Sequence, residues 1–334
     1  MRVSPLVAAL SIGNFIFAPP ALSRATFITI DPPGALSSVA FALSEGGTVA
    51  GDFGDSRAFH GFIRTLDGTI VAFDPAGSVD TVSRAINNNG EVAGYFSERN
   101  GVTHAFLRTP DGDVKVFDPP DAARTQAECI DGRGDIAGEY NDQSGVTHGF
   151  IRFTDGTFTT FDGPGATTTY VVSIDNDGSA AGTSYNSLTG NFGFLRAPDG
   201  TMTEFGVGKS DDNRVYGANG VRAATGNFMT IVSSGLSATH GFLRTADGSV
   251  ASFDPAGSLI TTPQAISTAN AVAGYFYDLK DQAHGFLRAP GGRIVRFDGP
   301  DAQSTEAYAI NGEGLVAGGY LDAGLRGHAF LRVP

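Results

Sequence analysis

The six histidines of this chain all open a recurring five-residue segment, and an aspartate recurs at a fixed distance from that segment. An imidazole and a carboxylate at fixed spacing suit three kinds of chemistry: a metal site, acid–base catalysis or a hydrogen-bonded structural pair. Five pairs are fourteen residues apart, and a sixth joins the two ends of the chain: His60 and Asp74, His104 and Asp118, His148 and Asp162, His240 and Asp254, His284 and Asp298, His328 and Asp31.

The pairing pattern favours structure over metal binding. One copy of the segment starts with Phe192 in place of histidine, and fourteen residues later Gly206 replaces the aspartate. Loss of both partners together is expected of a hydrogen-bonded pair, because a buried polar group that has lost its partner destabilises the fold more than the absence of both groups. We therefore predict six structural His–Asp pairs and no metal site. No cofactor is expected either, with a bound structural cation left open.

The segment belongs to a longer repeat. His60-Gly61-Phe62-Ile63-Arg64 is followed by an Asp67-Gly68 turn and by a run ending in Phe73-Asp74. Copies start at residues 60, 104, 148, 192, 240, 284 and 328, so each step is 44 residues except one of 48. A fixed period of this size predicts a repeat architecture.

Each repeat predicts four short strands separated by Gly, Asn or Asp turns, which is the content of one propeller blade. The predicted fold is therefore all-β, a seven-bladed β-propeller with four-stranded blades. Residues 26–31 resemble a fourth strand without the first three, and residues 328–332 end on a third strand. We expect the N-terminal strand to close the last blade, which hides a sheet edge.

Two further repeat positions predict packing. Gly61 or Ala105 should face Phe73 or Phe117 across a hairpin, because a small residue leaves room for a ring. The arginine that ends every third strand, such as Arg64, is expected to form a structural ion pair.

Residues 1–25 are predicted to be a signal peptide. Arg2 precedes an apolar run from Leu6 to Phe17, which is too short to span a bilayer, and small residues follow. Residues 26–334 then form a single propeller domain. We expect a secreted or periplasmic protein without membrane insertion.

The repeats resemble the HAF-repeat extracellular proteins, whose motif stands here as His104-Ala105-Phe106 and His328-Ala329-Phe330. The resemblance extends over residues 26–334. It implies an exported bacterial protein and brings no catalytic residue with it.

The composition limits the classes of molecule that the protein is expected to bind. The net charge of −13 argues against nucleic acid and anionic membrane surfaces. The single Cys129 aligns with alanines of other repeats and is expected to be a buried small residue, so no internal disulfide is available. We expect a monomer whose partner is a small molecule, a glycan or a protein.

The candidate site lies where the repeats differ. The residues eight and ten positions after the aspartate, on the first strand of each repeat, vary sharply. Two residues further on, the position is almost uniformly apolar and is expected to lie deeper in the channel; Tyr216 is assigned to this deep position. A concave polar channel mouth is a common propeller ligand site. The predicted ligand-binding residues are Arg84, Gln126, Glu128, Tyr170, Asp212, Arg214, Gln264, Glu306 and Tyr308.

Two functions fit this mouth. The favoured one is an exported non-catalytic binding or scaffold module that contacts a ligand or protein there. The alternative is a propeller enzyme, a hydrolase or lyase that uses mouth carboxylates such as Glu128, Asp212 and Glu306. The common hydrolase signatures are missing from the sequence, so catalytic residues stay unassigned.

Overall fold

The structure is a computed structural model that describes residues 25–220, 222–231 and 237–334. The predicted signal peptide, residues 1–25, lies outside the described residues except for its last position. The described residues form strands, turns and loops and contain no helix, so no helix there is long and apolar enough to cross a membrane.

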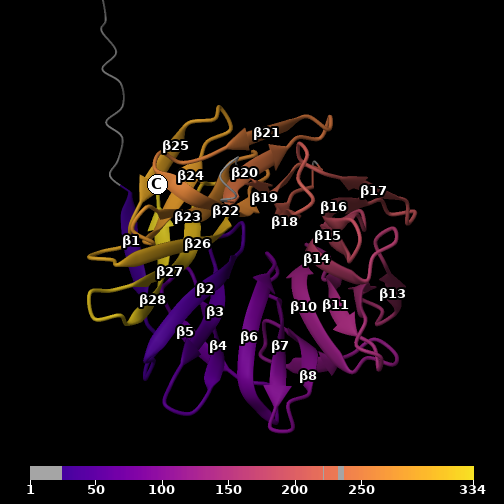
Figure 1. Cartoon of the computed structure of the whole chain (residues 1–334). Coiled ribbons are helices and arrows are strands. Elements are labelled where there is room, and N and C mark those ends of the chain that lie inside the picture. Colours follow the sequence, from indigo (N-terminus) through magenta and orange to yellow (C-terminus); the bar gives the residue numbers. More distant parts are fainter. Residues whose placement is uncertain (1–24, 221, 232–236) are drawn as a thin grey trace, which may run out of the picture.

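The strands form antiparallel four-stranded units arranged around a common centre (Figure 1). The innermost strands are β2 (Ser37–Leu43), β6 (Ser78–Ile86), β10 (Arg124–Ile130), β14 (Thr168–Ile174), β18 (Asn213–Ala218), β22 (Ser258–Ile266) and β26 (Ser304–Ile310). The second strands are β3 (Val49–Gly54), β7 (Val92–Glu98), β11 (Ile136–Asn141), β15 (Ala180–Asn186), β19 (Ala224–Ile231), β23 (Val272–Asp278) and β27 (Val316–Leu321).

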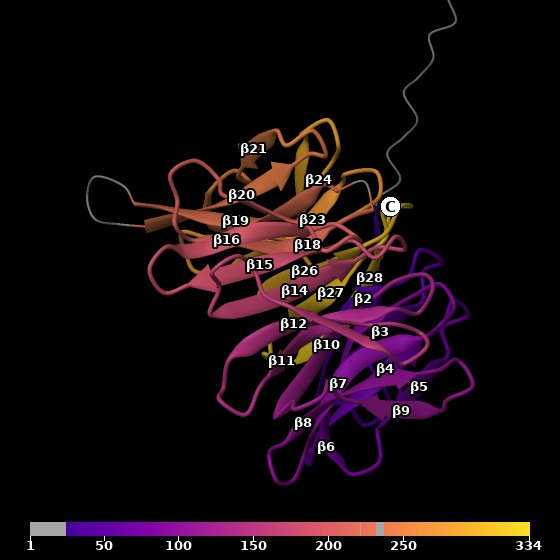
Figure 2. The ribbon, with the colours of Figure 1, turned by 90° about the vertical axis from the view of Figure 1, so that its right-hand side faces the viewer.

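The outer half of each unit contains the recurring segment. The third strands are β4 (Phe59–Arg64), β8 (Thr103–Arg108), β12 (Thr147–Arg152), β16 (Gly190–Arg196), β20 (Ser237–Arg244), β24 (Ala283–Arg288) and β28 (Gly327–Val333). The outermost strands are β5 (Ile70–Phe73), β9 (Val114–Phe117), β13 (Phe158–Phe161), β17 (Met202–Phe205), β21 (Val250–Phe253), β25 (Ile294–Phe297) and β1 (Thr26–Ile30). Figure 2 shows the units from the side.

The N-terminal strand completes the C-terminal unit, as the sequence predicts. β1 pairs antiparallel with β28, from Thr26 opposite Val333 to Ile30 opposite Ala329. β2 packs against β27 and β28, so the first and last units of the chain are neighbours. Single parallel bridges also join some adjacent units, for example Phe59 to Asp80 between β4 and β6.

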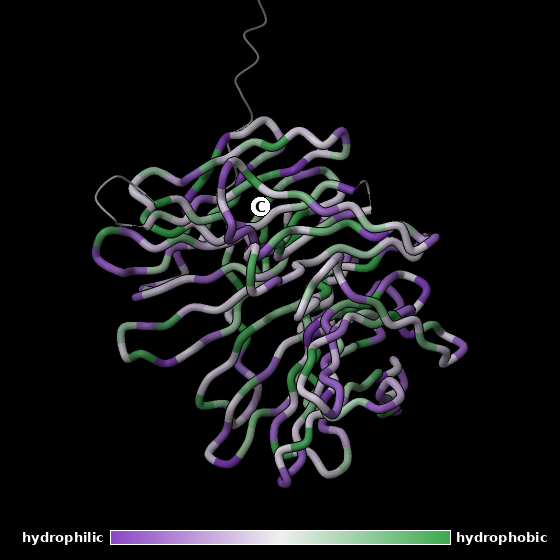
Figure 3. The backbone as a smooth tube through the Cα atoms, turned by 45° about the vertical axis from the view of Figure 1, so that its right-hand side comes forward, coloured by the Kyte–Doolittle hydropathy of each residue, from purple (hydrophilic) through white to green (hydrophobic). Residues whose placement is uncertain are grey.

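The core of each unit is built on one phenylalanine of the third strand. These rings are fully buried: Phe62, Phe106, Phe150, Phe194, Phe242, Phe286 and Phe330. The hydrophobic stretches follow the strands, and the loops at their ends are mainly hydrophilic (Figure 3). The predicted facing of a small residue and a ring is confirmed, since Gly61 lies opposite Phe73 and Ala105 opposite Phe117.

The ring of an outermost strand packs onto the next unit. Phe73 meets the buried Phe106 edge-on, with ring centroids 5.8 Å apart. The guanidinium of Arg108 lies over the same Phe73 ring, 5.0 Å from its centroid. The same Phe–Phe–Arg stack recurs at the next five seams along the chain.

The expectation of an ion pair at these arginines is therefore wrong. Each of them is used for a cation–π contact across a seam, because a ring and not a carboxylate lies within reach. Arg64 differs, since the strand preceding its unit ends in Ile30 where the other outermost strands carry phenylalanine.

This difference gives a matched test of the seam stack. Arg108 and Arg64 each donate a hydrogen bond from Nη1 to the next carbonyl, of Thr109 and Thr65. Only Arg108 has a ring beneath it. We expect Arg108→Met to lower the free energy of unfolding by about 1 kcal/mol more than Arg64→Met. Urea titration of both variants measures the difference, and equal losses would remove the cation–π contact from the account of seam stability.

Candidate functional site

The innermost strands share one irregularity. Each ladder between a first and a second strand skips a residue of the first strand at the same repeat position, which is a β-bulge, and β6 and β22 have a second shift near their start. The skipped residues at this shared position are Phe41, Arg84, Glu128, Val172, Tyr216, Gln264 and Tyr308. All of them line a single central cavity of about 290 Å³. The bulge thus turns one non-repeating side chain per unit into the channel.

The bulge also explains a repeated glycine. In β11 the Cβ of any other residue at Gly138 would collide with the Gln126 carbonyl oxygen, which the bulge pushes toward it. The residue after this glycine is again variable: the position holds Asp52, Tyr95, Glu139, Thr183, Asn227, Tyr275 and Gly319. The side chains of Asp52, Thr183 and Tyr275 contact the first strand of the next unit.

One sequence alignment is wrong by two residues. Arg214 pairs with Asn227 and the bulge falls on Tyr216, so Tyr216 occupies the channel position and is not a deep apolar residue. Arg214 then matches Gln126 and Tyr170, and Asp212 lies before the strand. The cause is Arg222, which adopts the positive φ of 60° that Gly90 (φ 80°) provides in the same turn of another repeat. Aligning on Gly220 missed this substitution.

An ion pair at the channel dominates the site. Arg84 Nε lies 2.7 Å from Glu128 Oε2, and the Arg84 guanidinium lies 5.3 Å from the centroid of the Phe41 ring. Burial alone would lower the pKa of Arg84, but the Glu128 carboxylate raises it by more, so the net shift is upward. Arg84 is therefore a permanent positive charge at the channel.

A cavity of about 480 Å³ opens beside this pair. Four of the predicted residues line it: Arg84, Glu128, Tyr170 and Arg214. Its wall also includes Glu139, Tyr185, Asn191 and Tyr216, which the sequence analysis did not assign to the site. Polar groups and rings of several units thus converge on one hollow, as ligand sites require.

The remaining predicted residues lie around the same mouth. Gln264 and Tyr308 line the central cavity. Glu306 accepts a hydrogen bond from the Tyr308 hydroxyl. Asp212 is held by Arg214 Nε at 3.0 Å and by Asn191 Nδ2 at 2.7 Å. Gln126 lies opposite Glu139 in the β10–β11 ladder.

Two acids of the second strands were missed, although their position after the repeated glycine is a sequence signal. Burial raises the pKa of Asp52 to about 7, against weaker lowering by the Ser83 N–H and Arg84. Burial and then the Glu128 charge raise the pKa of Glu139, whose Oε2 has no hydrogen-bond partner. The cavity beside Arg84 therefore contains, next to Glu128, a second carboxyl, that of Glu139, whose pKa is raised.

The His–Asp residues lie on the outer part of the units, between third strands and the loops that follow the outermost strands. Nδ1 of each histidine is 2.7–2.9 Å from its aspartate, including His328 with Asp31 across the chain ends. In four units Nε2 also faces a second carboxylate, of Asp55, Asp142, Asp278 or Asp322, at 3.3–3.6 Å. Where the pair is missing, the Phe192 ring lies beside Gly206.

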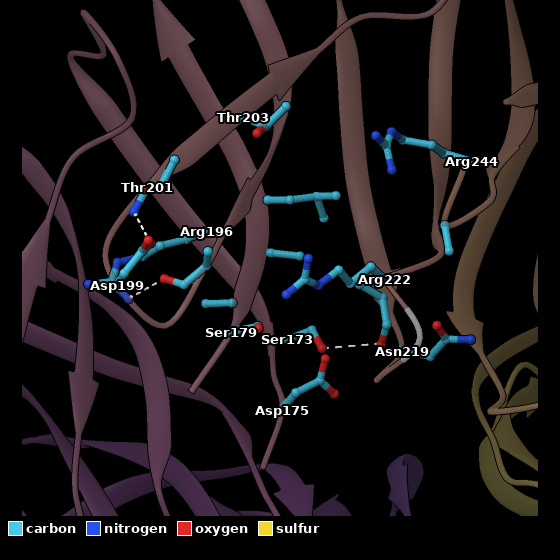
Figure 4. Close-up of a pocket in the computed structure, with 16 residues that line it drawn as sticks. Ser173, Asp175, Ser179, Arg196, Asp199, Thr201, Thr203, Asn219, Arg222 and Arg244 are labelled. Carbon is cyan, nitrogen blue, oxygen red and sulfur yellow. Dashed lines mark hydrogen bonds between the residues drawn. The ribbon is translucent and has the colours of Figure 1, made fainter. Parts of the chain in front are cut away.

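A further cavity of about 370 Å³ lies at the seam between β14–β17 and β18–β21 (Figure 4). Arg196, Arg222 and Arg244 surround it together with Asp175. At another seam the Asn87 amide donates to the Asp131 carbonyl of the next unit, a bond that the carboxylate of Asp175 cannot donate. Burial first, then Asp177 and Asp131, raise the pKa of Asp175 to about 6.

Comparison with known proteins identifies the architecture. No protein-family model matches the chain, and no curated protein matches it. The β-propeller domain of the Trilobed protease from Pyrococcus furiosus, described as having an open velcro topology, has a TM-score of 0.64 at 9% identity and covers 89% of this chain and 94% of its own. The fold is a β-propeller.

Two other similar structures are peptidase or hydrolase chains. A prolyl endopeptidase has a TM-score of 0.58 at 13% identity over 85% of this chain. A puromycin hydrolase S511A mutant complexed with PGG has a TM-score of 0.56 at 11% identity over 89% of this chain. The match covers 46% and 55% of those chains, so this chain spans about half their length. At these identities the likeness shows the fold alone.

The His–Asp contact can be tested by copying the unit that lacks it. His104→Phe leaves Asp118 without its partner and is expected to cost about 1–3 kcal/mol of unfolding free energy. His104→Phe with Asp118→Gly, which reproduces Phe192 and Gly206, should recover part of that loss. A double-mutant cycle by chemical denaturation gives the coupling energy. Independent, additive losses would show that the two side chains do not stabilise one another.

The raised pKa of Asp52 predicts that its contribution to the free energy of unfolding falls as the pH rises, the reverse of the usual behaviour of a carboxyl group. Between about pH 4 and pH 7 the folded protein retains a proton that the unfolded chain releases, so this group lowers stability as the pH rises through that window. Asp52→Asn should be more stable than the wild type above pH 7, by up to about 4 kcal/mol, and the gain should vanish near pH 4.

Asp55 is the control of opposite sign. Hydrogen bonds from the Arg57 and Ala58 N–H groups lower the pKa of its exposed carboxyl, so its contribution is present above the unfolded pKa and is lost in acid. Asp55→Asn should therefore lose stability at neutral pH. Thermal melts from pH 4 to pH 8 compare the two variants, and a parallel response would contradict the assignment of Asp52.

Proposed function

We propose that residues 26–334 form one closed propeller of seven blades of the HAF-repeat kind, exported by the signal peptide of residues 1–25. The pairing of β1 with β28 and the packing of β2 on β27 and β28 support the closure. We place the protein in the periplasm or outside the cell, as a monomer without nucleic-acid partners, in keeping with its net charge of −13.

We further propose that the protein is a non-catalytic binding module that holds a polar ligand at the channel mouth. The observation that carries this function is the set of bulges, which bring one non-repeating side chain of every unit to one cavity. Packing of the units needs no variation at these positions, so their charges and rings are available for recognition. The ligand classes that fit are a small molecule, a glycan or an exposed protein segment.

A hydrolase or lyase is the second candidate, and one observation favours it. Glu128 is paired with Arg84, while burial and the Glu128 charge raise the pKa of the neighbouring Glu139, and two carboxyls in unlike environments suit acid–base catalysis. Binding remains our conclusion because Glu128 is occupied by Arg84 and the Glu139 Oε2 atom is enclosed.

The function is tested by a triple substitution, Arg84→Ala, Glu128→Ala and Arg214→Ala. A glycan array and a metabolite library, read by thermal shift, first identify ligands of the wild-type protein. The triple variant should bind them at least about 100-fold more weakly, since several polar contacts of about 1–3 kcal/mol each are lost. Its melting temperature should change little, because both members of the ion pair are removed together.

Lys115→Ala is the control, because Lys115 is exposed on the outermost strand β9. It should bind as the wild type does. If the triple variant keeps the affinity of the wild type, the ligand is held elsewhere on the protein.

A further inference from the structure

A second cavity lies at the mouth, where the second strand of one unit carries a glycine at a position that holds a larger residue in the other units. Where the other second strands carry a polar or aromatic residue after the repeated glycine, β27 carries Gly319. A cavity of about 210 Å³ lies at this position, lined by Glu306, Tyr308 and Gly319 together with Val39 and Leu321. A Cβ at Gly319 would already come within 3.2 Å of Val39, so any larger residue would occupy the hollow.

The carboxylate in this cavity has no cationic partner. Glu306 lies opposite Gly319 in the β26–β27 ladder and accepts the Tyr308 hydroxyl. Two other acids of the mouth have such a partner, Glu128 in Arg84 and Asp212 in Arg214. Among the residues that the structure describes, no Lys, Arg or His nitrogen lies within 4.0 Å of Glu306.

Two aromatic residues, Tyr308 and Tyr320, line the cavity, and Phe41, Tyr275 and Tyr277 form a ring cluster with Tyr308. The Tyr308 centroid lies 5.1 Å from that of Phe41 and 6.1 Å from that of Tyr275, whose plane is turned by 68°. Tyr277 meets Tyr275 at 5.9 Å and 82°. Burial, followed by the Glu306 charge, raises the pKa of the three tyrosines in that cluster, so they stay neutral phenols.

We propose that this cavity binds a methylated ammonium group. The rings of Tyr308 and Tyr320, together with a carboxylate that has no cationic partner, attract an organic cation. A divalent metal needs several oxygen ligands, and a primary ammonium needs acceptors for three N–H donors. Glu306 is the only carboxylate of the lining, and the Ser38 hydroxyl is already bonded to the Ile30 carbonyl and the Ala329 N–H, so few acceptors remain besides Ser304 and the two tyrosines. The Val39, Gly319 and Leu321 surfaces suit methyl groups. The inference rests on the proposed mouth site and assigns chemistry to a cavity distinct from the one beside Arg84 and Glu128.

The test compares two ligands of nearly equal shape. Choline carries a trimethylammonium group, and 3,3-dimethylbutan-1-ol carries the uncharged tert-butyl equivalent. Isothermal titration of the full chain should give at least about tenfold tighter binding of choline. Glu306→Gln keeps an acceptor for Tyr308 but loses the charge, so its choline affinity should fall to that of the neutral alcohol.

Gly319→Thr is the second variant, since Thr183 occupies the equivalent position of β15 without disturbing its unit. It should close the cavity to both ligands. Glu313→Gln, an exposed acid in the β26–β27 turn, is the charge-matched control and should bind choline as the wild type does.

Two results would overturn the proposal: equal binding of choline and the alcohol, or no binding of choline by a wild-type protein with a normal melting curve. Either result leaves the triple variant at Arg84, Glu128 and Arg214 free to confirm or reject the mouth as a binding site. Conversely, choline binding lost in Gly319→Thr would support this cavity even if the larger one binds nothing.

Discussion

The structure depends on a contact between units: the ring of one outermost strand packed between the buried phenylalanine and the arginine of the next. Phe117 shows it, with Phe150 edge-on and the Arg152 guanidinium 4.7 Å above the ring. A four-stranded sheet of this size cannot bury a core alone, so its stability comes from such seams. The seam where Ile30 replaces the phenylalanine is also the one completed by pairing of the two chain ends.

Because the outer parts of the units provide these seams, the inner edge of each unit is free to vary. A bulged residue makes no regular pair in the ladder, so its side chain can differ between units at little cost to the stability of the sheet. The position holds Glu128, Val172 and Tyr216 in three consecutive units. The glycine opposite cannot vary, since the bulge places a carbonyl oxygen against it. The constant glycine of each second strand thus accommodates the bulge of the first strand, and the variable side chains at the bulges line one cavity.

The repeat made much of the fold predictable. Strand positions, the small residue facing each phenylalanine and the use of β1 by the last unit all follow from spacing and pattern, because hairpin registers are short-range. The arginine contacts did not follow, since their partner lies in the preceding unit and a charge suggests an ion pair by default. Most mouth residues were found as non-repeating positions, but Asp52 and Glu139 were missed because their strand had been assigned no role.

The misplaced alignment of β18 has an instructive cause. A positive φ indicates glycine or asparagine, and Gly220 was an obvious choice, yet the turn uses Arg222 there. Such strain costs of order 1 kcal/mol or more and persists only where the surroundings hold it. Arg222 lines the seam cavity with Asp175, at the one described turn of this type whose positive φ is carried by an arginine. This seam keeps the stack of Phe205, Phe242 and Arg244, so the unusual backbone of Arg222 leaves the packing between the units intact and changes only the lining of the cavity beside it.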